Sequence, residues 1–215
     1  MSDSAIQWLW ATPVSHVNLL DSGVVDPSVH QALQDFAAEH EDELANDERR
    51  SATATTKYTR YDTQVFERTR NDNLDAIRSI ILSQCDAYAA EVYGEAMREY
   101  EQRVTMWFVV QRNGHAKDAV HAHYHEGSDL AFVYYLTTPK DGSGQIALMD
   151  PRGPIGRGGF AVPRHSLIKF IEPQEGDMII FPRYLMHYTT PNTDTRTRRV
   201  IAGSVAYEAK PRSQA

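Results

Sequence analysis

Seven short apolar runs fill the second half of this 215-residue chain and limit the folds that it can adopt. They read VTMWFVVQ, AVHAHYH, LAFVYYLTT, QIALMD, SLIKFI, DMIIF and RVIAGSVAY. Turn-forming sequences such as NG, DGSG and PQEG separate them, and no helical pattern intervenes. Short strands joined by turns build a β-sandwich or a barrel. We therefore predict a mainly β core over residues 101–210.

The first hundred residues show a different pattern. Apolar residues recur at helical spacing from Pro27 to about Leu44, behind Asp26 as a helix N-cap, and again from Asn73 to about Tyr93. Between these helices, residues 46–63 are polar and are typical of a surface loop. We expect one α+β domain over residues 1–215, in which residues 1–100 supply an N-terminal strand and a helical layer.

Composition narrows the functional classes. The 29 acidic and 22 basic residues give a net charge of −7, which argues against a nucleic-acid-binding surface. The one cysteine, Cys85, cannot form an internal disulfide and lies on a predicted helix, where we expect it to be buried. We find no basic, apolar leader and no apolar run long enough to cross a membrane. We expect a soluble cytoplasmic protein, and the sequence leaves homo-oligomerisation open.

Three histidines alternate just ahead of the apolar run LAFVYYL. Alternate residues of a strand share a face, so His121, His123 and His125 would present their imidazoles on one side. Imidazole is the commonest metal ligand among side chains. Neighbouring members of the trio can share one ion, which leaves two pairs open: His121 with His123, or His123 with His125. A fourth histidine, His187, follows the strand DMIIF and completes a candidate metal site.

The order of these motifs resembles that of iron(II)- and 2-oxoglutarate-dependent oxygenases, in particular a bacterial and phage group. The shared sequences are His123-x-His125, VYYL at 133–136, MDPR at 149–152, Gly176-Asp177, FPRYLMH ending at His187, and an arginine about a dozen residues later. The resemblance implies a double-stranded β-helix, or jelly roll, with the N-terminal helices packed on one sheet. It also implies Fe(II) held by His123, His125 and His187, with His121 as the alternate ligand. His125 occupies the place where many related oxygenases have Asp or Glu.

The same resemblance implies 2-oxoglutarate and O2 as co-substrates. Decarboxylation of 2-oxoglutarate to succinate would then be coupled to oxidation of a second substrate. A basic residue on the last strand grips the far carboxylate in such enzymes, and Arg199 fits this position, with Arg198 as the alternate. Strand alternation allows only one of the two to face inward. Tyr135 is the candidate second contact, and we predict no catalytic residue beyond the metal ligands.

Two other functions fit the same residues. A cupin-like dioxygenase would use three histidines without 2-oxoglutarate, and His121-x-His123 followed by Glu126 loosely matches the first cupin motif. The distance from Gly176 to His187 departs from the second cupin motif. A non-enzymatic jelly-roll module with a bound metal is the other reading, although closed structural zinc sites usually use four ligands, often thiolates. The primary substrate is not encoded in any motif: a small molecule or a peptide or protein side chain remains open.

Overall fold

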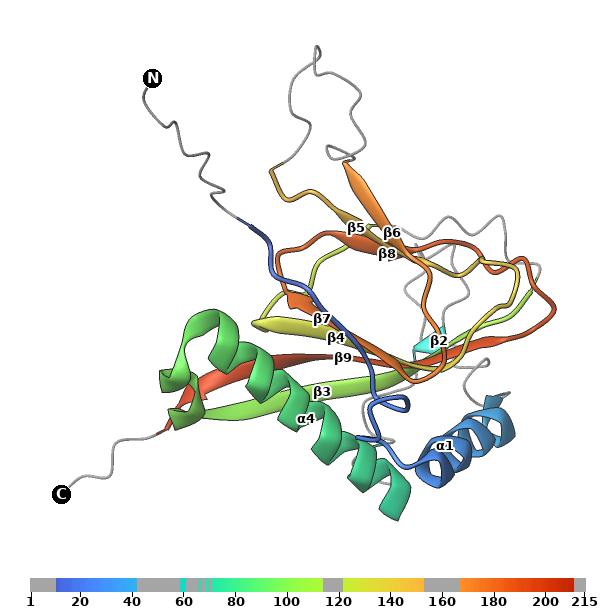
Figure 1. Cartoon of the computed structure of the whole chain (residues 1–215), viewed down its shortest axis with the longest axis horizontal. Helices are drawn as coiled ribbons and strands as arrows, with labels where there is room; N and C mark the ends of the chain where they lie inside the picture. The colour runs from blue at the N-terminus through green and yellow to red at the C-terminus, as the bar shows by residue number, and fades with distance from the viewer. Residues whose placement is uncertain are drawn as a thin grey trace, which may run out of the picture.

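Two antiparallel sheets face each other in the computed structural model, which describes residues 11–41, 59–60, 66, 69, 71–113, 122–152 and 167–210 (Figure 1). The larger sheet has the order β1 (Ser15–Asn18), β7 (Asp177–Pro182), β4 (Leu130–Thr137), β9 (Arg198–Ala209), β3 (Tyr100–Gln111) and β2 (Thr59–Arg60). The smaller sheet has the order β6 (Ile168–Ile171), β5 (Ile146–Met149) and β8 (His187–Thr189). This architecture confirms the predicted jelly roll.

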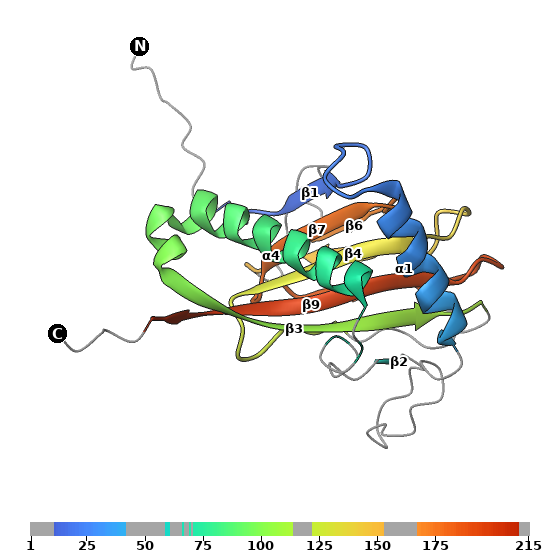
Figure 2. The same ribbon diagram turned by 90° about the horizontal axis from the view of Figure 1, so that it is seen from below.

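Both long helices cover one face of the larger sheet, as Figure 2 shows. Helix α1 (Pro27–Glu39) begins after Asp26, whose carboxylate accepts from Ser28 N–H, as predicted. Helix α4 (Asp72–Tyr93) begins after Asn71, and a short 3-10 turn, η1 (Glu95–Glu99), leads into β3. Within the described part of the chain, no helix has the length and apolar character that a membrane crossing requires.

The predicted helix boundaries hold at three of the four ends. The exception is the C-terminal end of α1, which we expected near Leu44 and which lies at Glu39. There the backbone N–H and the ring Nδ1 of His40 both turn back to the carbonyl of Phe36. Residues 42–44, and most of the predicted loop at 46–63, lie outside the described residues.

The central strands of the larger sheet are buried on both faces, and their residues alternate between two apolar cores. On β4, Phe132 and Tyr134 pack towards the helices, together with Leu33, Ile77 and Ile81. Ala131, Val133 and Tyr135 point into the space between the two sheets, as do Ile179 and Val200. This double burial explains why β4 is a continuous apolar run in the sequence.

The described part of the segment AVHAHYH, residues 122–125, is not a regular strand, contrary to our prediction. In this part, His123 forms an isolated antiparallel β-bridge to His187. The structure also contains two short strands that the sequence pattern did not reveal, β2 and β8, with two and three residues. Runs this short show no reliable period, so tertiary pairing decides them.

Gly203 lies where two neighbouring strands leave no room for a side chain. A Cβ built at this residue would lie 2.3 Å from Cζ of Phe132 and 2.6 Å from the backbone oxygen of Thr105. We expect Gly203→Ala to lower the free energy of unfolding by about 1–3 kcal/mol, because a buried ring and a backbone carbonyl must shift. Urea denaturation measures the change. Glu91→Ala, on the exposed face of α4, is the control and should stay within about 0.5 kcal/mol.

Candidate metal centre

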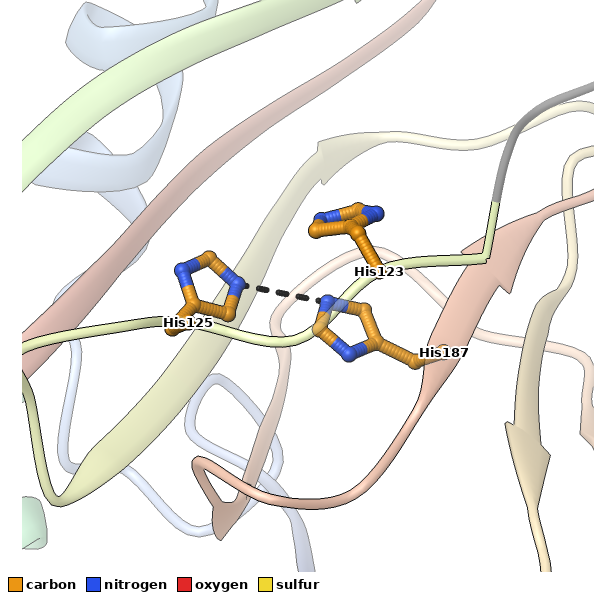
Figure 3. A group of neighbouring side chains, drawn as sticks. All are labelled: His123, His125 and His187. Carbon is orange, nitrogen blue, oxygen red and sulfur yellow. Dashed lines mark hydrogen bonds between the residues drawn. The ribbon is translucent and has the colours of Figure 1, made fainter.

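Three histidines meet between the two sheets (Figure 3). His123 and His125 come from the segment that precedes β4, and His187 is the first residue of β8. One ligand nitrogen from each lies within 4.8 Å of the other two. The ring centroid of His187 is 4.4 Å from that of His123 and 5.1 Å from that of His125. Such a group can hold one metal ion and leaves part of its coordination sphere open.

Backbone pairing positions these histidines before any ion binds. The N–H of His123 donates to the carbonyl of His187, and the N–H of His187 donates back to His123, both at 3.0 Å. The N–H of His125 donates to the carbonyl of Arg183 at 3.3 Å. The irregular segment 122–125 is thus held against the loop between β7 and β8. The bridge joins the two halves of the site, although they are far apart in the sequence.

The protonation of His187 suits a metal ligand. Its Nδ1–H donates to the carbonyl of Leu185 at 2.9 Å, and a carbonyl can only accept. The lone pair of the neutral ring is therefore on Nε2, which lies 3.3 Å from Nε2 of His125. Burial, with a smaller contribution from His123, lowers the pKa of His187 to about 3. The ring is neutral at physiological pH, so no proton has to leave before a metal binds.

Aromatic rings enclose the cluster. Trp107 of β3 stacks on His125 with 5.9 Å between ring centroids, and Phe181 of β7 meets His187 edge-on at 4.7 Å. Both side chains are buried. They limit the rotation of the imidazoles and keep bulk water away from one side of the site. The sequence did not assign Trp107 to the site, and its inward position on β3 is the signal that would have placed it here.

The histidines line a cavity of about 800 Å³ between the sheets. The inward faces of β3 and β9 form one long wall, lined by Arg103, Thr105, Trp107, Val109, Arg198, Val200, Ala202, Ser204 and Ala206. In the register of β3 with β9, Thr105 pairs with Ser204 towards the outer end of this wall. Gln111 pairs with Arg198 at the opposite end of the wall. This wall therefore extends beyond the histidines in both directions.

Arg198, not Arg199, faces this cavity, which corrects our prediction. Arg198 is 2% exposed and lines the cavity. Arg199 lies on the opposite face of β9, where its Nε donates to Glu41 Oε2 at 3.0 Å. The cause is the strand register: Arg198 shares the inward face with Val200 and Ala202, so its neighbour must point outward. The predicted arginine at the start of the last strand is present. The inward-facing residue, however, is Arg198, one position before Arg199.

Tyr135 lies beside Arg198, and Tyr134 points the other way, to His30, as the alternation requires. Cζ of Arg198 is 5.2 Å from the centroid of the Tyr135 ring. Within the described residues, neither Arg198 Nε nor the Tyr135 hydroxyl has a hydrogen-bond partner. Burial raises the pKa of that hydroxyl, against the weaker effect of the neighbouring positive charge, so it remains a donor. A buried cation beside a buried donor is suited to a carboxylate.

The remaining candidates from the sequence lie elsewhere. Glu126 is exposed at the rim of the cavity and accepts a hydrogen bond from the Tyr124 hydroxyl at 3.0 Å. It is not a member of the three-histidine group. His121, the alternate ligand, lies outside the described residues.

A jelly roll with an inward group of three histidines has the architecture of a metal site with open coordination positions. Residues 105–203 match the model of the family described as "Putative 2OG-Fe(II) oxygenase". Its members are oxidoreductases that use Fe(II), 2-oxoglutarate and O2. The match includes β3, the histidine segment, β4 and His187. No curated protein matches the chain.

Solved structures share the fold at low sequence identity. A prolyl-4-hydroxylase from Pseudomonas putida is 14% identical, with a TM-score of 0.60 over 93% of this chain and 94% of that one. SnoN, a non-haem alpha-ketoglutarate-dependent epimerase of nogalamycin biosynthesis, is 18% identical, with a TM-score of 0.57 over 92% and 81%. A viral collagen prolyl hydroxylase from Paramecium Bursaria Chlorella virus-1 is 10% identical, with a TM-score of 0.55 over 97% and 99%.

We predict that replacing any one of His123, His125 and His187 by alanine weakens Fe(II) binding by more than about 100-fold, since even residues that only orient ligands contribute about 10- to 100-fold. Metal content after gel filtration and Co(II) titration measure the loss. His16→Ala is the control, because its ring pairs with Asp177 at 2.8 Å, outside the cluster. Loss of metal in His121→Ala, with retention in His125→Ala, would favour the cupin-like ligand set instead.

Proposed function

We propose that the chain is a 2-oxoglutarate-dependent oxygenase in which His123, His125 and His187 bind Fe(II), while Arg198 and Tyr135 bind the far carboxylate of 2-oxoglutarate. One observation carries this assignment: a buried arginine opens into the same cavity as the three histidines. The arginine matches a carboxylate in charge and in geometry, because its guanidinium can donate two parallel hydrogen bonds.

The charge balance favours an anionic co-substrate over a reaction that uses none. Three neutral imidazoles leave the full charge of a divalent ion uncompensated, and Arg198 adds a further positive charge. In the described residues, Arg198 forms no ion pair, whereas Arg199 pairs with Glu41. A dicarboxylate would compensate the charge of the metal ion with one carboxylate and the charge of Arg198 with the other. The cupin-like reading offers no role for a buried arginine at this position.

The protein would hold the metal and the co-substrate in the required orientation and would exclude water from the site. When bound, Fe(II) and 2-oxoglutarate together with O2 supply the oxidising chemistry, with succinate and CO2 as the products of the co-substrate. His187 offers Nε2 in a fixed tautomer because Leu185 holds the proton on Nδ1. Trp107 and Phe181 shield the ligand rings. Arg198 and Tyr135 would orient the co-substrate from the far end.

The second substrate would occupy the outer part of the cavity. There the wall formed by β3 and β9 changes from apolar side chains to Thr105, Ser204 and Arg103. Hydroxyl groups and an exposed guanidinium suit a polar substrate. Solved structures with the same fold include a prolyl-4-hydroxylase and an epimerase of nogalamycin biosynthesis. We propose a small molecule or a peptide side chain as the substrate class.

Anaerobic titration tests the co-substrate assignment. Fe(II)-loaded protein mixed with 2-oxoglutarate should develop the weak visible charge-transfer band of the chelate. We expect Arg198→Met to raise the Kd of 2-oxoglutarate by about 10- to 100-fold, because a hydrogen-bonded charged contact contributes about 1.5–3 kcal/mol.

The neighbouring arginine provides a matched control. Arg199→Met removes the same charge from the outer face, where the side chain binds Glu41, and should leave the Kd of 2-oxoglutarate unchanged. If iron-loaded, folded wild-type protein shows no band, the co-substrate assignment is wrong. Equal effects of the two variants would show that Arg198 acts only through overall charge.

A further inference from the structure

A third buried polar atom lies without a partner near Arg198. Gln111 is 6% exposed, and its Oε1 has no hydrogen-bond partner in the described residues, like Arg198 Nε and the Tyr135 hydroxyl. Burying an unpaired polar atom costs free energy, so such atoms are uncommon in native proteins. Here two donors and one acceptor occur on the same inward face. The three atoms indicate a binding site that is completed by a ligand.

The strand register places Gln111 next to Arg198. The two residues are directly paired across β3 and β9. Gln111 continues the inward series of Trp107 and Val109, which line the cavity. Its Nε2 donates to the carbonyl of Thr190 at 3.2 Å, just after β8. The side chain therefore spans from the larger sheet to the smaller one, and the anchored Nε2 leaves Oε1 as its remaining hydrogen-bonding atom.

An ion-pair cluster fixes the same two strand ends from the outside. Glu41 binds Arg112 through Oε1 and Arg199 through Oε2, and these arginines are the chain neighbours of Gln111 and Arg198. The hydrogen bonds from both arginines lower the pKa of Glu41 against the opposing effect of burial, so the carboxylate stays charged. The single carboxylate thereby offsets part of the charge of the two outer arginines, and the backbone that carries the inner pair is held in register.

We propose that Gln111 is a positioning residue for the co-substrate: when 2-oxoglutarate binds, the Gln111 Oε1 accepts an N–H of Arg198, which turns the rest of the guanidinium towards the far carboxylate of 2-oxoglutarate. This inference rests on the proposed function. Gln111 is suited to the task because its amide is neutral. An acidic residue in its place would pair with Arg198 and compete with the co-substrate, whereas an apolar residue would leave the guanidinium free to rotate.

The test uses two variants of the full chain, loaded with Fe(II) and titrated anaerobically with 2-oxoglutarate. We expect Gln111→Leu to raise the Kd about tenfold, which corresponds to about 1.4 kcal/mol. Gln111→Glu, which is nearly isosteric, should raise it at least about 100-fold because its carboxylate occupies Arg198. Bound iron and the thermal unfolding midpoint check that each variant is intact. If the leucine variant does not fold, the glutamate variant carries the test.

A shorter 2-oxo acid separates positioning from a general structural effect. 2-Oxobutyrate can chelate the metal but lacks the far carboxylate, so its Kd should be the same in wild type and in both variants. Gln31→Glu, on the exposed face of α1, makes the same charge change and should alter neither Kd.

Each other outcome is decisive. A wild-type chelate band with unchanged affinity in both variants would overturn the role of Gln111 and leave the proposed function standing. Equal weakening of 2-oxobutyrate would also overturn it, since the effect would then be structural. No band in wild type would overturn the proposed function and this inference together.

Discussion

The alternation of side chains along strands that are buried on both faces governs this structure. β4, β9 and β3 lie between the helical layer and the cavity, so every residue on them belongs to one side or the other. A shift of one residue would exchange the two sets. The alternation sends Tyr134 to His30 and Tyr135 to the cavity. It likewise separates Arg198 from Arg199, and so decides which positive charge the site contains.

As a result, the two faces of the larger sheet differ in whether their arginines have a charged partner. On the outer face, Glu41 forms ion pairs with both Arg112 and Arg199. On the inner face, Arg198 is buried beside the aromatic ring of Tyr135. A buried charge is stable only when a partner or a ligand compensates it. This arrangement supports the proposed binding of an anion at one end of the cavity and of a metal ion at the histidines.

The metal centre depends on a second feature, the backbone bridge between His123 and His187. It places two ligands from distant parts of the chain side by side, while an irregular segment carries His125 to the same point. Because this segment is not a regular strand, strand geometry alone could not have defined the site. The ligand geometry instead follows from the contacts with the β7–β8 loop.

The sequence by itself determined the fold class, the two helices, the N-cap of α1, the three histidines that meet in the cavity, and an arginine at the start of the last strand. These follow from periodicity, turn residues and motif order, which are local properties of the chain. It could not determine the face of β9 that carries Arg198, the roles of Trp107 and Gln111, or the strands β2 and β8. Those depend on register and on pairing between distant segments, because a strand's side chains acquire an inside and an outside only when its neighbours are in place.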